Sequence, residues 1–286
     1  MRCSATNEIE LGEMFVMYID LHTHTTASDG QYTPSELVTM AKEKNIELLS
    51  ITDHDTVSGL EEAVEAAHRC NIDFIPGIEI STHMGVEIHI LGFYVDYKNK
   101  ILVEKCEEYE KSRSNRAIRI CDYLNGIGIP VVLDEVEKYA GDGSIGRPHF
   151  AQWLQEHDYV QTRKEAFSRY LDTPRFKAAT ERTKPTPEEA IELIHDAGGI
   201  AVMAHPGLLK LGRKNQESII RALKAAGMDG LECFYSKHEK KQEEYYLRLA
   251  MEYGLKISCG SDFHGEKVKP DVFLGMKVNA NHIEIL

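Results

Sequence analysis

The stretch Asp20-Leu21-His22-Thr23-His24 decides how the chain is interpreted, because it places two histidines at the end of a short strand predicted at 18–21. Residues two apart on a strand point to the same side, so both imidazoles can bind one ion. A single His-x-His pair is a weak signal, since two histidines on a polar strand face can simply be solvated. Its weight comes from similar groups further along the chain.

Histidine and carboxylate side chains recur where other predicted strands end. They are, in chain order, Asp29, Asp53-His54, Glu79, His89, His205 and Asp262-x-His264. Taken alone, Asp29 could belong to an ordinary turn, and a single buried histidine is more often a core residue than a ligand. A buried carboxylate is costly unless it is paired or bound to metal. Because imidazole and carboxylate are ligands of catalytic transition metals, the recurrence predicts a multinuclear metal centre and metal-assisted hydrolysis.

Seven strands are predicted, and most are separated by helices. They are 18–21, 47–52, 74–80, 86–94, 200–204, 230–234 and 256–259. Two helices begin with capping boxes, in Thr33-Pro34-Ser35-Glu36 and Thr186-Pro187-Glu188-Glu189. This spacing implies parallel strands with crossover helices, and the expected ligands fall at the carboxyl ends of these strands, except His89 within its strand. That rim is where (β/α) barrels build their active sites.

The alternation of strands and helices stops between 99 and 185. This part is charged and helical, with helices predicted at 101–125, 133–139, 148–157 and 164–170, and with an exposed loop within 159–183. We therefore expect four units. They are an N-terminal extension (1–17), the first part of a barrel (18–98), an inserted helical domain (99–185) and the second part of the barrel (186–286).

The composition limits the class of partner. With 286 residues, 42% of them hydrophobic, the chain can bury one large α/β core. The formal net charge of −13 argues against binding to long duplex DNA or an anionic membrane, but it leaves room for a small phosphorylated substrate. No apolar run approaches the roughly 18 residues of a membrane span. The sequence indicates no obligate protein partner.

The six cysteines form no Cys-x-x-Cys pair. An even count is compatible with disulfides. The chain length, the scatter of the cysteines and the lack of a signal-peptide pattern instead favour reduced thiols in a cytoplasmic protein.

Taken together, the histidine and carboxylate motifs resemble the polymerase and histidinol phosphatase (PHP) superfamily from about Tyr18 to His264. The stretch Arg147-Pro148-His149-Phe150-Ala151 narrows the resemblance. With this stretch, the chain is similar to stand-alone bacterial PHP phosphoesterases. These enzymes act on nucleoside monophosphates, on 3′,5′-bisphosphates or, as 5′–3′ exoribonucleases, on the 5′ ends of short RNA. The resemblance implies an α/β fold, a distorted (β/α)7 barrel, with a trinuclear metal site.

The resemblance also implies which residues hold each ion. One ion would be held by His22, His24, Glu79 and Asp262, a second by Asp29, His54 and His264, and a third by His89, His205 and a bridging Glu79. Six histidines and three carboxylates disfavour calcium and a pure magnesium site. Manganese, iron and zinc remain open, and the resemblance favours manganese or iron.

The expected reaction is direct attack on phosphorus by a metal-bridging hydroxide, with the ions stabilising the developing charge. Arg147 and His149 are the candidates for phosphate contact, and His149 could also protonate the leaving oxygen. Alternatively, Arg147 caps a helix and His149 packs within it. Asp53 is expected to orient His54 or another ligand. Lys237 and His238 either line the mouth of the substrate site or belong to a solvated loop.

Three other functions stay open. Histidinol-phosphate phosphatase is a related activity within the same class of enzymes. An amidohydrolase also begins with His-x-His on a barrel strand, but it requires a bridging carboxylated lysine where this chain has Glu79. A non-catalytic, metal-dependent binding module is the third, and the complete ligand set counts against it.

Overall fold

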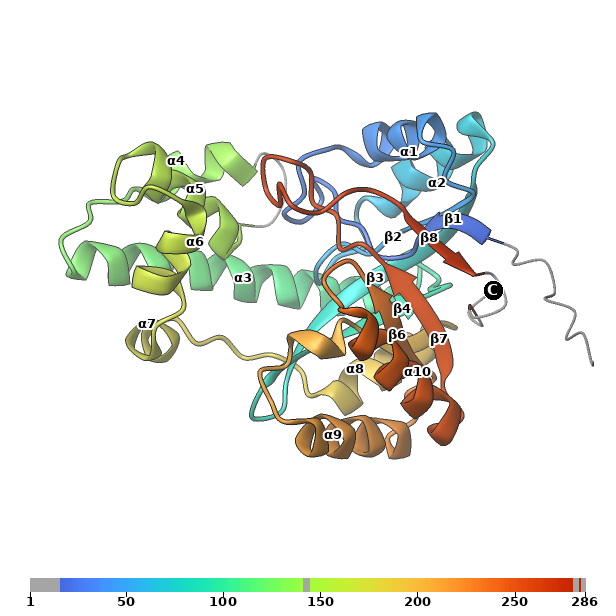
Figure 1. Cartoon of the computed structure of the whole chain (residues 1–286). Helices are drawn as coiled ribbons and strands as arrows, with labels where there is room; N and C mark the ends of the chain where they lie inside the picture. Colours follow the sequence, from blue (N-terminus) through green and yellow to red (C-terminus); the bar gives the residue numbers. More distant parts are fainter. Residues whose placement is uncertain (1–15, 141–144, 280–282, 284–286) are drawn as a thin grey trace, which may run out of the picture.

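Eight β-strands form one curved sheet in the computed structural model, which describes residues 16–140, 145–279 and 283. The strands are β1 (Val16–Asp20), β2 (Leu48–Ile51), β3 (Asp73–His83), β4 (Glu87–Phe93), β5 (Ile200–Met203), β6 (Gly230–Tyr235), β7 (Lys256–Gly260) and β8 (Met276–Asn279). Their order in the sheet is β7-β6-β5-β4-β3-β2-β1-β8. A parallel bridge between Thr23 and Phe263, which follow β1 and β7, draws the ends together. The result is a nearly closed α/β barrel, which confirms the predicted fold class (Figure 1).

The eighth strand was not predicted from the sequence. It pairs antiparallel with β1, from Val16 opposite Asn279 to Ile19 opposite Met276. The first strand therefore begins at Val16, two residues before its expected start. The rest of the expected extension, 1–15, lies outside the described residues.

β4 is antiparallel to both of its neighbours, β3 and β5, so the expectation of an all-parallel barrel is wrong at this strand. The tight connection between β3 and β4 leaves no room for a crossover helix, and the two strands form a hairpin. Because β4 runs in the opposite direction, its first residues lie at the rim where the parallel strands end. This is why His89, opposite Ser81 in the hairpin, reaches the same rim as the other expected ligands.

The helices outside the barrel begin where the capping motifs predict. Thr33 and Thr186 cap helices α1 (Pro34–Glu43) and α8 (Pro187–Asp196), each in a complete capping box. Helices α2 (Leu60–Cys70), α9 (Arg213–Ala225) and α10 (Lys240–Tyr253) and a 3₁₀ turn, η2 (Pro206–Leu208), complete this layer. Their apolar faces, such as Leu37, Val38 and Ala41 on α1, are fully buried against the barrel.

A helical segment, defined here as residues 100–179, lies between β4 and α8 and extends to one side of the barrel (Figure 1). It contains α3 (Lys100–Gly126), α4 (Leu133–Ala140), α5 (Arg147–Glu156), α6 (Arg163–Ala166), a π-helical turn η1 (Phe167–Leu171) and α7 (Pro174–Ala179). Helix α7 lies where an exposed loop was expected. The segment has its own apolar cluster, which includes Leu124, Phe150, Trp153 and Phe176. Among the described helices, none is long and apolar enough to cross a membrane.

A buried ionic network fixes the helical segment against the barrel rim. The carboxylate of Asp55, in the loop after β2, accepts hydrogen bonds from the Arg113 side chain of α3 at 2.8 Å and from Arg182 at 2.7 Å. Its other oxygen accepts the Ser81 backbone N–H at 2.7 Å. Burial alone would raise the pKa of Asp55, but the two guanidinium groups lower it below its ordinary value.

Replacement of Asp55 by alanine should therefore destabilise the protein strongly. Two guanidinium groups would remain buried without their carboxylate, which costs about 3–5 kcal/mol in the free energy of unfolding. Urea denaturation measures this loss. The matched control is Glu61→Ala, since Glu61 pairs with Lys98 at the surface and should be dispensable. Equal stability of Asp55→Ala and the wild type would contradict the role given to this network.

Candidate metal centre

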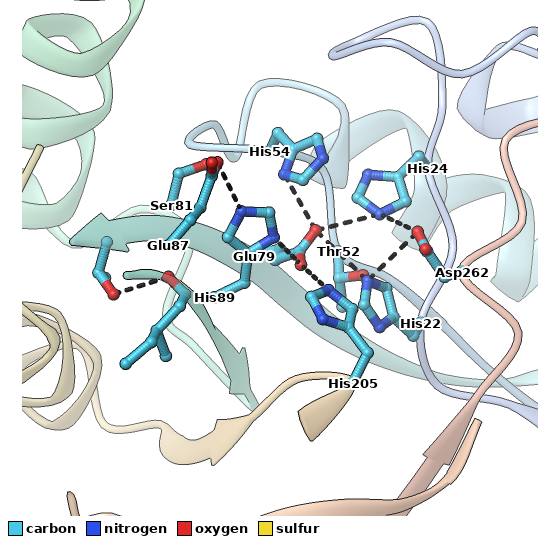
Figure 2. A network of polar contacts seen from close by, with 12 residues as sticks. His22, His24, Thr52, His54, Glu79, Ser81, Glu87, His89, His205 and Asp262 are labelled. Carbon is cyan, nitrogen blue, oxygen red and sulfur yellow. Dashed lines mark hydrogen bonds and ion pairs between the residues drawn. The ribbon is translucent and has the colours of Figure 1, made fainter. Parts of the chain in front are cut away.

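The nine expected ligand side chains meet at one end of the barrel. Figure 2 shows part of this set: His22, His24, His54, Glu79, His89, His205 and Asp262. Glu79 on β3 lies at the centre and is fully buried. One of its oxygens, Oε2, faces imidazole nitrogens of His22 at 3.3 Å, His24 at 3.3 Å and His54 at 2.9 Å. The other, Oε1, faces His89 at 2.7 Å and His205 at 3.0 Å. One carboxylate thus contacts five imidazoles from four different segments of the chain.

The second carboxylate, Asp262, follows β7 and extends the cluster on one side. Its Oδ1 lies 3.4 Å from His24 Nε2 and 3.7 Å from His22 Nε2. The third carboxylate, Asp29, lies 3.3 Å from His264 Nε2 and 4.0 Å from His24 Nδ1. Asp262 adopts a left-handed conformation, with φ of 61°, where the chain turns sharply after the strand.

These side chains form four overlapping groups whose nitrogen and oxygen atoms lie within 4.8 Å of one another. The groups are His24, Asp29, His54 and His264; His22, Glu79 and His205; His22, His24 and Asp262; and His54, Glu79 and His89. All nine residues predicted from the sequence take part. Their distribution among individual ions stays a prediction.

The donor atoms fit a bound cation. His22 Nε2, both ring nitrogens of His24, His54 Nδ1 and Glu79 Oε2 are buried and have no hydrogen-bond partner among the described residues. Buried polar atoms are nearly always partnered, so such a group needs an explanation. Divalent ions bound by imidazole and carboxylate would supply the missing partners.

The electrostatics of the cluster follow from its burial. Burial would raise the pKa of Glu79, but the surrounding imidazoles, His54 first, hold that pKa well below its ordinary value. Burial would lower the pKa of His89, but Glu79 and Glu87 raise it to about 9. The carboxylates therefore stabilise positive charge at this site, and metal ions would compete with protons for the same nitrogens.

Asp53 makes its hydrogen bonds in the loop that follows the His22-x-His24 motif. Its carboxylate accepts hydrogen bonds from the Thr25 backbone N–H at 2.8 Å, the Thr25 hydroxyl at 2.6 Å and the Ser28 hydroxyl at 2.5 Å. It therefore holds the loop that carries Asp29, and its contacts do not reach the ring of His54. A direct catalytic role for Asp53 stays a prediction, whereas its positioning of the Asp29 loop is visible in these contacts.

Sequence reasoning missed two other buried carboxylates beneath the ligands. Asp20 accepts hydrogen bonds from the Ser261 hydroxyl and backbone N–H at 2.5 and 2.9 Å, and burial raises its pKa to about 6. Glu232 on β6 contacts His22 and His205. Both lie within short apolar strands, and the same feature is what makes Glu79 a candidate ligand in the sequence. Glu232 is not followed by a histidine motif, and Asp20 directly precedes His22-Thr23-His24, so its own contacts are not evident beside those two histidines.

A cleft opens from the metal centre toward the helical segment. Asp29, His54, His89 and His264 form its floor. Six cationic side chains also line it, and we call it the cationic cleft: Arg113, Arg116, Arg147, Arg182, Lys184 and Lys269. Its volume is 170 Å³. A larger cavity of 920 Å³ lies at the other end of the barrel, beside α2 and the start of β3, away from all nine ligands.

Two of the cations in the cleft face Glu87. Lys184 Nζ lies 2.6 Å from Glu87 Oε1, and burial lowers the pKa of Lys184 to about 8. Arg147 lies 3.9 Å from Glu87 and 3.8 Å from Asp172, beyond hydrogen-bond distance of either carboxylate. Arg147 therefore lines the cleft beside the metal ligands, where the sequence interpretation required it. Its contact with a substrate stays a prediction.

The other predicted substrate contacts are placed less favourably. His149 is buried at the start of α5, and its Nδ1 accepts the Gly146 backbone N–H at 3.0 Å, which matches the packing alternative. The ring of His238 donates from Nδ1 to the Cys233 carbonyl and accepts the Gly207 N–H at Nε2. Lys237 is exposed. His149, Lys237 and His238 are absent from the lining of the cationic cleft, and their substrate roles stay predictions.

The family model of the PHP domain matches residues 20–224. The chain belongs to the PHP domain family. This PHP protein is 39% identical over 248 residues to the 5′-3′ exoribonuclease of Haemophilus influenzae, a match that covers 86% of this chain and 89% of that protein. It is 35% identical over 248 residues to the 3′,5′-nucleoside bisphosphate phosphatase of Chromobacterium violaceum, covering 86% and 87%.

Solved structures of similar proteins agree over nearly the whole chain. An amidohydrolase from Chromobacterium violaceum, with bound sulfate and no metal, has a TM-score of 0.86 at 33% identity, covering 93% of this chain and 94% of that one. A metal-dependent phosphoesterase from Bifidobacterium adolescentis has a TM-score of 0.79 at 30% identity, covering 93% and 91%. The chain is therefore an enzyme of the PHP phosphoesterase class, as the sequence predicted.

Replacement of Glu79 by glutamine should remove bound metal and activity together. The amide carries no negative charge and presents an NH₂ group to the surrounding imidazoles, so it cannot serve several ions at once. We expect activity to fall by more than the roughly 100-fold typical of lost outer contacts around metal ligands. Elemental analysis of the purified variant measures the metal. Glu65→Gln, on the exposed surface of α2, is the control. An unchanged metal content in Glu79→Gln would contradict the central role of Glu79.

Proposed function

We propose that the protein is a metal-dependent phosphoesterase that hydrolyses phosphate esters of nucleotides. Its substrate is a nucleoside 5′-monophosphate, a nucleoside 3′,5′-bisphosphate or the 5′ end of a short RNA. One observation carries the proposal: the cationic cleft opens directly onto the cluster of nine ligand side chains. The names of the relatives from H. influenzae and C. violaceum, which refer to RNA and nucleotide chemistry, support it.

The nine side chains would hold three divalent ions, with manganese or iron ahead of zinc. Six imidazoles and three carboxylates are the donor set that such metals accept. Bound ions of this kind supply a nucleophile from water at neutral pH and stabilise negative charge on phosphoryl oxygens. Glu79 would hold more than one ion, since both of its oxygens face imidazoles.

The cationic cleft would bind the remainder of an anionic substrate. Arg147 is the best placed, because its guanidinium lies beyond hydrogen-bond distance of Glu87 and Asp172 and its N–H groups can reach a phosphate in a bidentate manner. Arg113 and Arg182 are held by Asp55 and contribute positive potential. A chain with a net charge of −13 thus focuses positive potential at one place, which attracts polyanions locally.

His149 is the candidate for protonating the leaving oxygen. Because its Nδ1 accepts the Gly146 N–H, a neutral His149 carries its proton on Nε2. Burial lowers the pKa of His149 and favours this neutral form, which can donate its Nε2–H to a phosphoryl oxygen as a hydrogen bond, whereas transfer of a proton to the leaving oxygen requires the imidazolium form. In this role the cap at the start of α5 would also fix the direction of the proton donor.

The charge of the cleft separates nucleotides from histidinol phosphate. Histidinol phosphate carries a protonated amine, which the excess of cations in the cleft would repel, whereas a nucleotide with a second phosphate or a phosphodiester gains from that excess. A cytoplasmic location belongs to the same proposal. The thiols of Cys70, Cys106, Cys121 and Cys259 are free, as in a reducing compartment.

Phosphate release from a substrate panel tests the proposal. With added Mn²⁺, the panel contains AMP, 3′-phospho-AMP, a 5′-phosphorylated trinucleotide, histidinol phosphate and a generic aryl phosphate. We expect kcat/KM for at least one nucleotide to exceed that for histidinol phosphate by about tenfold or more, the effect of one charge-assisted contact. Cleavage of histidinol phosphate alone would overturn the nucleotide assignment.

Arg147→Ala sharpens the same test. Loss of a charge-assisted contact should raise KM for the preferred nucleotide by roughly 10–100-fold, with a smaller effect on the aryl phosphate. Arg169→Ala is the matched control, since Arg169 lies in the same helical segment and pairs with Glu165 at its surface. Equal effects of the two substitutions would remove Arg147 from the proposed substrate site.

A further inference from the structure

Glu232 is a fully buried carboxylate in the middle of β6, between Leu231 and Cys233. No lysine or arginine in the described part of the chain forms an ion pair with it. A buried carboxylate without a permanently charged partner lowers stability, because the free energy of its desolvation is not offset. Its presence in an apolar strand therefore calls for a role beyond packing.

Both oxygens of Glu232 face parts of the metal centre. Oε1 lies 3.0 Å from Nδ1 of His22, and Oε2 accepts the backbone N–H of His205 at 2.6 Å. His22 follows β1 and His205 follows β5, so one side chain joins two ligands from opposite parts of the sequence. The rings of His22 and His205 stack, with centroids 5.6 Å apart, and together with Glu79 they form one of the four ligand groups.

The contact with His22 selects one tautomer of the imidazole. A carboxylate can only accept a hydrogen bond, so Nδ1 carries the proton, and in the neutral imidazole that binds metal Nε2 keeps its lone pair. Nε2 is the atom that faces Glu79 and has no hydrogen-bond partner among the described residues. A carboxylate behind a ligand histidine both orients the ring and strengthens its free nitrogen as a donor to metal.

The contact with His205 stabilises an unfavourable backbone conformation. His205 has φ of 28° and ψ of 58°, in the left-handed region that a non-glycine residue adopts only when its surroundings enforce it. This turn directs its Nε2 to within 3.0 Å of Glu79 Oε1. Glu232 holds the N–H of that same residue, so the conformation that places the ligand depends on this carboxylate.

The strand next to β6 makes room for this arrangement. Gly260, at the end of β7, lies against both partners, and a Cβ there would fall 2.2 Å from His22 Cβ and 2.9 Å from Glu232 Oε1. Only glycine allows the carboxylate and the imidazole to meet at this point. The contact is thus built by residues of three strands.

We propose that Glu232 is a positioning residue that fixes two ligands of the metal centre on either side of Glu79, His22 through its ring and His205 through its backbone, before any ion binds. This inference rests on the metal centre of the proposed function. It adds that the His22–Glu79–His205 group is preorganised, so that the ions it contacts are bound more tightly than the three side chains alone would achieve.

Binding of Mn²⁺ alone, measured by equilibrium dialysis, tests the inference without any substrate. Glu232→Gln keeps the shape but offers one acceptor oxygen for two N–H donors. We expect the affinity for the Mn²⁺ ions that His22 and His205 contact to fall roughly 10–100-fold, while the affinity for the ion expected at Asp29, His54 and His264 is unchanged. Activity measured at saturating Mn²⁺ should recover toward the wild-type kcat, which a misfolded site would not allow.

Asp229→Asn is the matched control. Asp229 directly precedes β6 and also joins a histidine ring, His195, to a backbone N–H, that of Ala201, but at the end of the barrel away from the metal centre. The Asp229→Asn variant should give the same Mn²⁺ binding isotherm as the wild type. If Glu232→Gln does not fold, Glu232→Asp replaces it, because the shorter side chain keeps the charge but cannot span both partners.

The outcomes separate the two proposals. A wild type that binds no Mn²⁺ overturns the metal centre and with it this inference. Binding by the wild type with an unchanged isotherm in the Glu232 variant overturns the positioning role alone. Equal weakening by Asp229→Asn would show a general effect of acidic residues around β6 and would also overturn it.

Discussion

The buried carboxylate of Glu79 is the constraint on which the rest of the structure depends. Its two oxygens face five imidazoles, while no lysine or arginine of the described chain pairs with it. Desolvation of such a group is unfavourable. Glu79 is therefore tolerated in the apolar strand β3 only if histidines that follow other strands lie level with it and contact its carboxylate. The contacts between Glu79 and these histidines therefore restrict the register in which the strands of the barrel can pair.

Three further buried carboxylates hold the segments that carry the ligands in fixed positions. Asp20 ties the end of β1 to Ser261 after β7, Asp53 holds the loop that carries Asp29, and Glu232 joins His22 to His205. Each accepts at least one backbone N–H in a place where water is excluded. The ligands are thus oriented by the fold itself, and little reorganisation remains for the moment when cations bind.

Much of this arrangement could be predicted from the sequence, because the signals were local. The capping boxes at Thr33 and Thr186, seven of the strands and the nine ligand residues all depend on short motifs that can be recognised one at a time. The antiparallel direction of β4, the pairing of β8 with β1 and the roles of Asp20 and Glu232 could not be predicted in this way. They arise from contacts between residues far apart in the chain, and an isolated acidic residue in an apolar strand does not reveal its partner.

The helical segment contributes cationic side chains to the cleft beside the metal centre. Asp55 holds Arg113 of this segment, and Arg182 just after it, at the rim, so the ionic network that joins the segment to the barrel also brings positive charge to the cleft. The central claim, that separate strand ends together bind a cluster of cations, is tested most directly by anomalous diffraction from crystals grown with excess Mn²⁺. The account predicts peaks in direct contact with the nine side chains. Side chains spread apart around an empty cavity would contradict it.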